Sequence, residues 1–242
     1  MTGRLLIVGS GEFTPSMVDI DRDILATIGT TTPRVAIVPT AAGLEDTPNS
    51  WIEMAAAHFG ALGAETVPVM VLGRDDARDP RWSRAIADAD WIYFSGGNPG
   101  HLVESLEGTP FWSAVRRRVR AGALLAGSSA GAMMLGSLTI LPLDRDDRGM
   151  PRRIGFRAGL GVLPGIFIAP HFDILPESVL AGWTDHWPTD HRMLGIDEDT
   201  VLLQRASDWT VRGKGRVLTF QSLTLRDEHR TGAVLNGLEV SM

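Results

Sequence analysis

Along the first half of the chain, short aliphatic runs alternate with segments of helical periodicity. The runs are rich in Val, Ile and Leu, as are parallel strands that are buried on both faces of a sheet. They cover residues 5–8, 35–38, 66–72, 91–94 and 123–126. Helices are predicted over residues 49–62, 80–89, 99–106 and 110–120, the last three each beginning with a proline. The alternation predicts an α/β fold with a doubly wound, mostly parallel sheet flanked by helices.

The sequence pattern changes in the second half of the chain. Residues 144–148 are charged and are predicted to form an exposed loop, which a glycine-rich segment connects to the apolar residues 166–168. After residue 200, short apolar runs punctuated by glycines predict C-terminal β-hairpins that extend or flank the main sheet. A chain of 242 residues with 44% hydrophobic residues can bury one substantial core. We therefore expect a single α/β domain over residues 1–242.

Composition excludes several classes of function. The chain has 23 Lys and Arg against 29 Asp and Glu, a formal charge of -6. It therefore lacks the excess of basic residues with which a protein binds nucleic acid or an anionic membrane. A small partner is expected instead. The chain contains no cysteine, which excludes disulfides, thiolate metal sites and cysteine nucleophiles. No apolar run is long enough for a signal peptide or a membrane span, so we expect a cytoplasmic protein.

The strongest local motif is Gly-Ser-Ser-Ala-Gly at residues 127–131, which follows a predicted strand and precedes a run of small residues that begins a helix. This is the G-x-S-x-G pattern in the context that a nucleophile elbow requires. Small neighbours permit a tight turn that strains the serine backbone and exposes its hydroxyl. The pattern predicts Ser129 as a nucleophile and the amide of Ala130 as half of an oxyanion hole. The alternative is a turn that merely lets the helix pack close to the sheet.

A serine hydroxyl needs a base, and the chain has six histidines. His171 follows the apolar residues 166–169 and one proline. It is therefore expected just past the carboxyl end of a strand, at the same edge as Ser129. His101 lies in the loop of residues 95–101 and is the rival base. The histidines predicted to be structural or solvated are His58 and His229.

Two patterns that would indicate a metal or a cofactor are incomplete. His186 and His191 lie close to two aspartates, but their spacing matches no strong zinc motif, so a polar helix end is the preferred interpretation. Gly9 and Gly11 follow the first predicted strand, but the last glycine of a dinucleotide-binding G-x-G-x-x-G motif is missing. We predict no metal and no organic cofactor.

An acidic side chain should orient the imidazole, and the segment of residues 194–200 brings three acids to the end of a strand-like run. Glu198 is one of four candidates, because Asp173, Asp197 and Asp199 compete with it. The order serine, histidine, acid along the chain also differs from the α/β-hydrolases, in which the acid precedes the histidine. The common lipase and esterase fold is therefore disfavoured.

Five ordered motifs, spread over nearly the whole chain, resemble the serine peptidase family that contains cyanophycinase and peptidase E. The motifs are Gly-Ser-Gly-Glu at 9–12, Phe-Ser-Gly-Gly-Asn at 94–98, Gly-Ser-Ser-Ala-Gly-Ala at 127–132, Pro-His-Phe at 170–172 and Gly-Ile-Asp-Glu-Asp-Thr at 195–200. The resemblance implies a fold like that of the class I glutamine amidotransferases, with serine in place of the cysteine nucleophile. Because the chain lacks cysteine, amidotransferase chemistry itself is excluded.

The resemblance also implies an activity and a set of site residues. It implies a serine peptidase that cleaves a small peptide or isopeptide bond through an acyl-enzyme, as a monomer or a homodimer. The alternative is a catalytically silent relative that binds a small peptide or metabolite. The residues carried over are Ser129 as nucleophile, His171 as base, Glu198 as acid, Gly97 and Ala130 as oxyanion donors, and Asn98 and Ser128 as substrate contacts.

Departures from the family leave the substrate open. Cyanophycinase has a glutamine before the catalytic histidine and arginines shortly after it, whereas this chain has Pro170 there and no basic residue before Arg192. The cation with which peptidase E binds an N-terminal aspartate also has no counterpart in the segment after His171. Three arginines in the preceding predicted loop are candidates for a carboxylate clamp, although a solvated charge run is the preferred interpretation. These are Arg152, Arg153 and Arg157.

Overall fold

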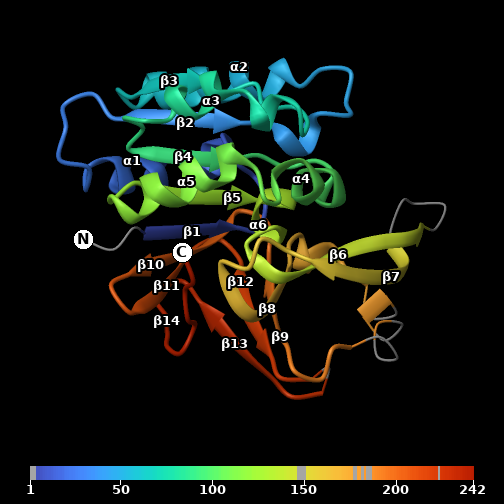
Figure 1. The fold of residues 1–242 in the computed structure, drawn as a ribbon. Helices are drawn as coiled ribbons and strands as arrows, with labels where there is room; N and C mark the ends of the chain where they lie inside the picture. Colours follow the sequence, from blue (N-terminus) through green and yellow to red (C-terminus); the bar gives the residue numbers. More distant parts are fainter. Residues whose placement is uncertain (1–3, 146–150, 177–178, 181–182, 184–186, 223) are drawn as a thin grey trace.

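The computed structural model describes residues 4–145, 151–176, 179–180, 183, 187–222 and 224–242. Two β-sheets form the framework, and Figure 1 shows the blue-to-green half of the chain stacked on the orange-to-red half. The first sheet has eight strands in the order β14-β11-β10-β1-β5-β4-β2-β3. Its parallel strands are β1 (Arg4–Val8), β2 (Arg34–Val38), β3 (Glu65–Pro68), β4 (Trp91–Phe94) and β5 (Leu124–Ser128).

Helices cover both faces of the first sheet, as the alternating pattern predicts. In β1, Leu5 and Ile7 belong to one buried cluster, whereas Leu6 and Val8 belong to another, because successive side chains of a strand point to opposite faces. The first cluster is completed by η2 (Thr40–Ala42), η3 (Asp76–Arg78), α3 (Pro80–Ala85), α4 (Pro99–Leu106) and α5 (Pro110–Arg120). The second is completed by η1 (Pro15–Met17), α1 (Val18–Leu25) and α2 (Asn49–Ala61).

The helix starts that the prolines predict are confirmed, and a side chain caps each of the three. Asp79 accepts a hydrogen bond from the amide of Arg81 at the start of α3. Asn98 accepts a hydrogen bond from the amide of His101 at the start of α4, and Thr109 accepts one from the amide of Trp112 at the start of α5. The predicted helix over residues 80–89 ends earlier, at residue 85. The chain has to turn there, because the amide of Asp90 already bonds to the sheet.

The C-terminal strands divide between the two sheets. An antiparallel extension of the first sheet is formed by β10 (Thr200–Arg205), β11 (Asp208–Gly213) and β14 (Val234–Leu235). The prediction that the C-terminal runs extend or flank the main sheet is confirmed for these strands. The sequence pattern did not predict a second, separate sheet.

This second sheet has six strands in the order β13-β12-β9-β8-β6-β7. Its strands are β6 (Gly136–Arg145), β7 (Pro151–Ala158), β8 (Leu163–Ala169), β9 (Arg192–Ile196), β12 (Arg216–Phe220) and β13 (Arg226–Arg230). The hairpin of β6 and β7 projects to the right of Figure 1. The predicted loop over residues 144–148 is wrong at its start, because Asp144 pairs with Arg153 across the hairpin; residues 146–150 lie outside the described part of the chain.

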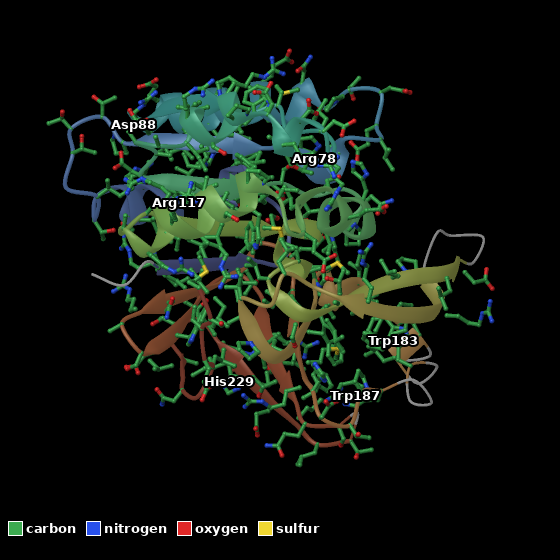
Figure 2. The ribbon with its side chains drawn as sticks, in the orientation of Figure 1. Arg78, Asp88, Arg117, Trp183, Trp187 and His229 are labelled. Atoms are coloured by element: carbon green, nitrogen blue, oxygen red, sulfur yellow. The ribbon has the colours of Figure 1, made fainter. Side chains whose placement is uncertain are left out.

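A third apolar cluster, which includes Phe167, Met193 and Phe220, packs on the second sheet. Trp183 and Trp187 belong to this cluster and lie below the hairpin in Figure 2. No helix of the described residues is long and apolar enough to cross a membrane. The single-domain organisation stays a prediction of the sequence.

Candidate active site

Ser129 lies at a sharp turn between β5 and the short helix α6 (Ala130–Met133). Its backbone has φ 50° and ψ -114°, a left-handed conformation that is strained for any residue with a side chain. Two glycines make the turn sterically feasible. A Cβ added to Gly127 would lie 2.1 Å from the carbonyl oxygen of Gly131, and one added to Gly131 would lie 2.3 Å from that of Phe94. The strained backbone that the G-x-S-x-G pattern predicts is present.

His171 comes to Ser129 from the second sheet. It directly follows the strand β8 and one proline, and its own φ of 53° is also left-handed. The Nε2 atom of His171 lies 2.8 Å from Oγ of Ser129, a distance that suits a hydrogen bond. The prediction that His171 follows a strand end is confirmed, but the prediction that this strand shares an edge with Ser129 is wrong, because β8 belongs to the second sheet.

Glu198 lies on the other side of the imidazole. Its Oε1 is 2.6 Å from Nδ1 of His171. An ionised carboxylate only accepts hydrogen bonds, so Nδ1 carries the proton, and in the neutral imidazole Nε2 is left free to accept the hydroxyl proton of Ser129. Glu198 reaches this position from the link between β9 of the second sheet and β10 of the first. The three side chains thus form one hydrogen-bonded line that joins the two sheets.

The acids that competed with Glu198 are engaged elsewhere. Asp173 accepts a hydrogen bond from the backbone amide of Glu198 at 2.9 Å. Asp197 accepts two hydrogen bonds from Arg216; burial raises the pKa of Asp197, while these bonds act to lower it. Asp199 accepts hydrogen bonds from a serine and a lysine of neighbouring segments. Of the four candidates, Glu198 is therefore the acid that meets the imidazole.

The loop before α4 packs directly on the elbow. A Cβ added to Gly96 would lie 3.3 Å from Cβ of Ser129. Gly97 has φ 135°, and a Cβ there would lie 2.5 Å from the carbonyl oxygen of Ala41, so the close approach of the two backbones requires glycine. Among the described residues, the amides of Gly97 and Ala130 have no hydrogen-bond acceptor. Both N–H groups are available to a ligand, as an oxyanion hole requires.

The two predicted substrate contacts differ in their placement. Asn98 is exposed beside Gly97, but its Oδ1 already caps α4, which leaves the amide NH2 group for a ligand. Ser128 is completely buried, and its hydroxyl donates a 2.6 Å hydrogen bond to Glu12. Since a fully buried hydroxyl cannot touch a substrate, the placement of Ser128 does not support the predicted contact.

Glu12 is the residue near the elbow to which the sequence analysis assigned no role. It is buried, with 8% of its surface exposed, and its other oxygen accepts a 3.0 Å hydrogen bond from the amide of Gly96. The signal in the sequence was an acid four residues after the first predicted strand, in one of the loops that gather at the carboxyl edge of the sheet.

The other described histidines contact groups that lie away from the Ser129–His171–Glu198 line. His101, the rival base, contacts the carbonyl oxygen of Leu72 at 2.7 Å. His229 lies on the strand β13 of the second sheet (Figure 2), and its Nε2 is 3.2 Å from Oγ1 of Thr219. His186 lies outside the described residues. The described part of the chain holds no group of three or more side chains suited to bind a metal ion. His58 contacts Asp21, and His191 contacts Asp190.

The three candidate arginines lie on β7 and not in a loop. Arg157 donates a 3.2 Å hydrogen bond to the carbonyl oxygen of Gly100, in the first turn of α4. Arg153 lies 4.0 Å from Asp144. The side chain of Arg152 is outside the described part of the structure.

A helix-flanked sheet that places a serine at a strand-to-helix turn, within hydrogen-bond distance of a histidine, is an arrangement found in serine-type hydrolases. A comparison with family models supports the same class, because the model of peptidase family S51 matches residues 5–211. The chain belongs to peptidase family S51.

The curated relatives of the chain include cyanophycinases and a peptidase E. The cyanophycinase of Nostoc sp. is 29% identical over 182 residues, which are 72% of this chain and 60% of the relative. The peptidase E of Shewanella amazonensis is 27% identical over 195 residues, which are 73% of this chain and 75% of the relative. The chain thus spans only about 60% of the length of the Nostoc cyanophycinase.

Solved structures extend the similarity to the whole fold. A crystal structure of a peptidase from an acI-B1 Actinobacterium superposes with a TM-score of 0.84 and 30% sequence identity, and the match covers 98% of each chain. A putative peptidase E from Listeria monocytogenes matches 89% of this chain with a TM-score of 0.64 and 16% identity, which supports the fold alone. The predicted α/β fold class is confirmed.

Proposed function

We propose that the chain hydrolyses a small peptide or isopeptide bond through a Ser129–His171–Glu198 triad and an acyl-enzyme. The observation that carries the proposal is the line of hydrogen bonds from Oγ of Ser129 through the imidazole to Glu198, with distances of 2.8 and 2.6 Å. A serine hydroxyl is a weak nucleophile, and a base within hydrogen-bond reach that is oriented by a third group is the arrangement that activates it.

In the first half of the reaction, Oγ of Ser129 attacks the carbonyl carbon of the scissile bond while Nε2 of His171 takes the hydroxyl proton. The carbonyl oxygen becomes an oxyanion, and the free amides of Gly97 and Ala130 are the donors available to it. His171 then passes its proton to the leaving amine as the carbon–nitrogen bond breaks. The acyl group remains on Ser129 as an ester.

The second half repeats these steps with water as the nucleophile. His171 takes a proton from water as it attacks the ester, and then returns that proton to Oγ of Ser129 when the carboxylate product leaves. Glu198 keeps Nδ1 protonated throughout and stabilises the imidazolium that forms in each half. The proposed mechanism requires only side chains and amides of this chain and one water molecule.

We base the proposed substrate class on the relatives and on the loop of residues 95–98, which carries the proposed oxyanion donor Gly97. Both named relatives, cyanophycinase and peptidase E, suggest a small peptide or isopeptide substrate, and the exposed amide of Asn98 lies next to the proposed oxyanion donor Gly97. The monomeric or homodimeric state and the cytoplasmic location stay predictions of the sequence.

The proposal is tested by covalent labelling with a fluorophosphonate probe and peptide mass mapping. We expect the wild type to be labelled at Ser129, and Ser129→Ala and His171→Ala to lose the label while keeping the wild-type melting temperature. His101→Ala, which removes the rival histidine, should be labelled at the wild-type rate. A folded wild type that takes up no label would refute the triad and favour the silent, ligand-binding relative. Labelling would justify a screen of dipeptides with acidic, basic and isopeptide-linked residues.

A further inference from the structure

Glu12 bridges the two backbone segments that carry the proposed oxyanion donors. Its Oε2 accepts the hydroxyl proton of Ser128, at the end of β5, over 2.6 Å. Its Oε1 accepts the amide proton of Gly96, in the loop before α4, over 3.0 Å. Ser128 and Gly96 each lie one or two residues before a proposed donor, Ala130 and Gly97 respectively. One carboxylate therefore connects both halves of the proposed oxyanion hole.

The bridge has little room to move. A Cβ added to Gly96 would lie 3.3 Å from Oε1 of Glu12 and 3.3 Å from Cβ of Ser129, so these three groups are packed against one another. Ser128 and Gly96 are both buried, which removes water as an alternative partner for their polar groups. A displacement of one segment would break a buried hydrogen bond, and leaving a buried donor without an acceptor is costly.

Burying a carboxylate is also costly, because its charge loses the solvation of water. The described part of the chain offers Glu12 no basic side chain as a salt-bridge partner, and its recorded partners are the neutral hydroxyl and amide. The two hydrogen bonds that Glu12 accepts are therefore the interactions that offset this cost and hold its carboxylate in place.

We propose that Glu12 is a positioning residue that sets the separation and direction of the two oxyanion donors, an inference that rests on the proposed triad mechanism. An oxyanion hole stabilises the transition state only when both N–H groups lie about 2.7–3.1 Å from the oxyanion. Glu12 touches neither substrate nor the reacting atoms. It acts through Ser128 and Gly96, and this gives the buried hydroxyl of Ser128 the role of an anchor.

A comparison of Glu12→Ala with Glu12→Gln separates positioning from charge. The alanine removes both hydrogen bonds. The glutamine retains them, because its amide oxygen accepts from Gly96 and its NH2 group donates to Oγ of Ser128. We expect the rate of fluorophosphonate labelling to fall at least about tenfold in Glu12→Ala, since one misplaced oxyanion donor costs about 100-fold or more, and Glu12→Gln to stay within about threefold of the wild type.

Two further readouts distinguish positioning from a structural role. The pH at which labelling is half-maximal should be the same in all three proteins, because the line from Ser129 through His171 to Glu198 is untouched. Hydrogen exchange in a peptide that spans residues 95–98 should be faster in Glu12→Ala than in the wild type, and restored in Glu12→Gln. This second readout is independent of any enzymatic activity.

The outcomes distinguish a failure of this inference from a failure of the proposed function. A wild type that is not labelled overturns both. A labelled wild type with an equally reactive, folded Glu12→Ala overturns the positioning role alone, and so does a folded Glu12→Gln that is as slow as the alanine variant. If Glu12→Ala does not fold, Ser128→Ala removes one of the two hydrogen bonds, and an unchanged labelling rate in that variant refutes the inference.

Discussion

Replacing Glu198 by glutamine tests which acid orients the imidazole. The substitution keeps the size of the side chain and removes its charge. Oε1 of Glu198 lies 2.6 Å from Nδ1 of His171, in the range of a short, charge-assisted hydrogen bond. Asp199→Asn is the matched control, since it removes one carboxylate charge from the adjacent residue, and asparagine tolerates the left-handed backbone of that position.

The expected loss follows from the type of hydrogen bond. Bonds to charged groups contribute about 1.5–3 kcal/mol and neutral ones about 0.5–1.5 kcal/mol, so the amide forfeits about 1–2 kcal/mol. That difference corresponds to about a 5- to 30-fold slower acylation. The side chain of Glu198 is 41% exposed, so water screens the charge and the low end of this range is expected. A glutamine that turns its NH2 group toward Nδ1 would favour the wrong tautomer and cost up to about 10⁴-fold.

The assay is the second-order rate of fluorophosphonate labelling at Ser129, with melting temperatures to show that each variant is folded. We expect Glu198→Gln to be slower by at least about fivefold and Asp199→Asn to stay within about threefold of the wild type. Wild-type labelling of Glu198→Gln, together with a slow Asp199→Asn, would show that the orientation of the imidazole has been assigned to the wrong acid.

Three further predictions concern stability and folding. In Gly131→Ala the new Cβ would lie 2.3 Å from the carbonyl oxygen of Phe94, so we expect a loss of about 2 kcal/mol or more in urea unfolding and a loss of labelling; wild-type stability would contradict the steric argument. Gly60→Ala, in the exposed face of α2 with no atom near the new Cβ, should instead stabilise the protein by about 0.5–1 kcal/mol, and a lower unfolding midpoint would count against it. Burial raises the pKa of Asp21 above its ordinary value near 3.8, although its hydrogen bond to His58 acts to lower it. The folded state therefore holds this proton more tightly than the unfolded state, and stability is lost as the pH rises from below 3.8 through the raised pKa. The stability of the wild type relative to Asp21→Asn should decline over that interval and then level off, and an increase would reverse the sign of the assigned shift.

Local patterns predicted most elements of the first sheet, because β1, β2 and β4 are nearly continuous apolar runs and each predicted helix begins at a proline or carries an apolar face. The exception is β3, a half-exposed strand at residues 65–68 where an apolar run over 66–72 was predicted. The second sheet was missed for an equally physical reason. The hairpin of β6 and β7 contains glycines, prolines and charges along both strands, and pairing between strands compensates for their weak local propensity. Such pairing leaves no local period in the sequence.

The sequence by itself singled out Ser129 as the proposed nucleophile, because the strained turn requires glycines at fixed offsets and these are visible as a local motif. Through the positions of the histidines and acids along the chain, it also limited the base to His171 or its rival His101 and the acid to four candidates. Only the tertiary structure decided among them. His171 contacts Ser129, and Glu198 contacts His171, because β8 and β9 pair in a second sheet. These contacts join residues 42 and 27 positions apart, so they depend on tertiary structure and not on local conformation. The burial of Glu12 between Ser128 and Gly96 has the same origin, since three loops far apart in the sequence converge at one edge of the first sheet.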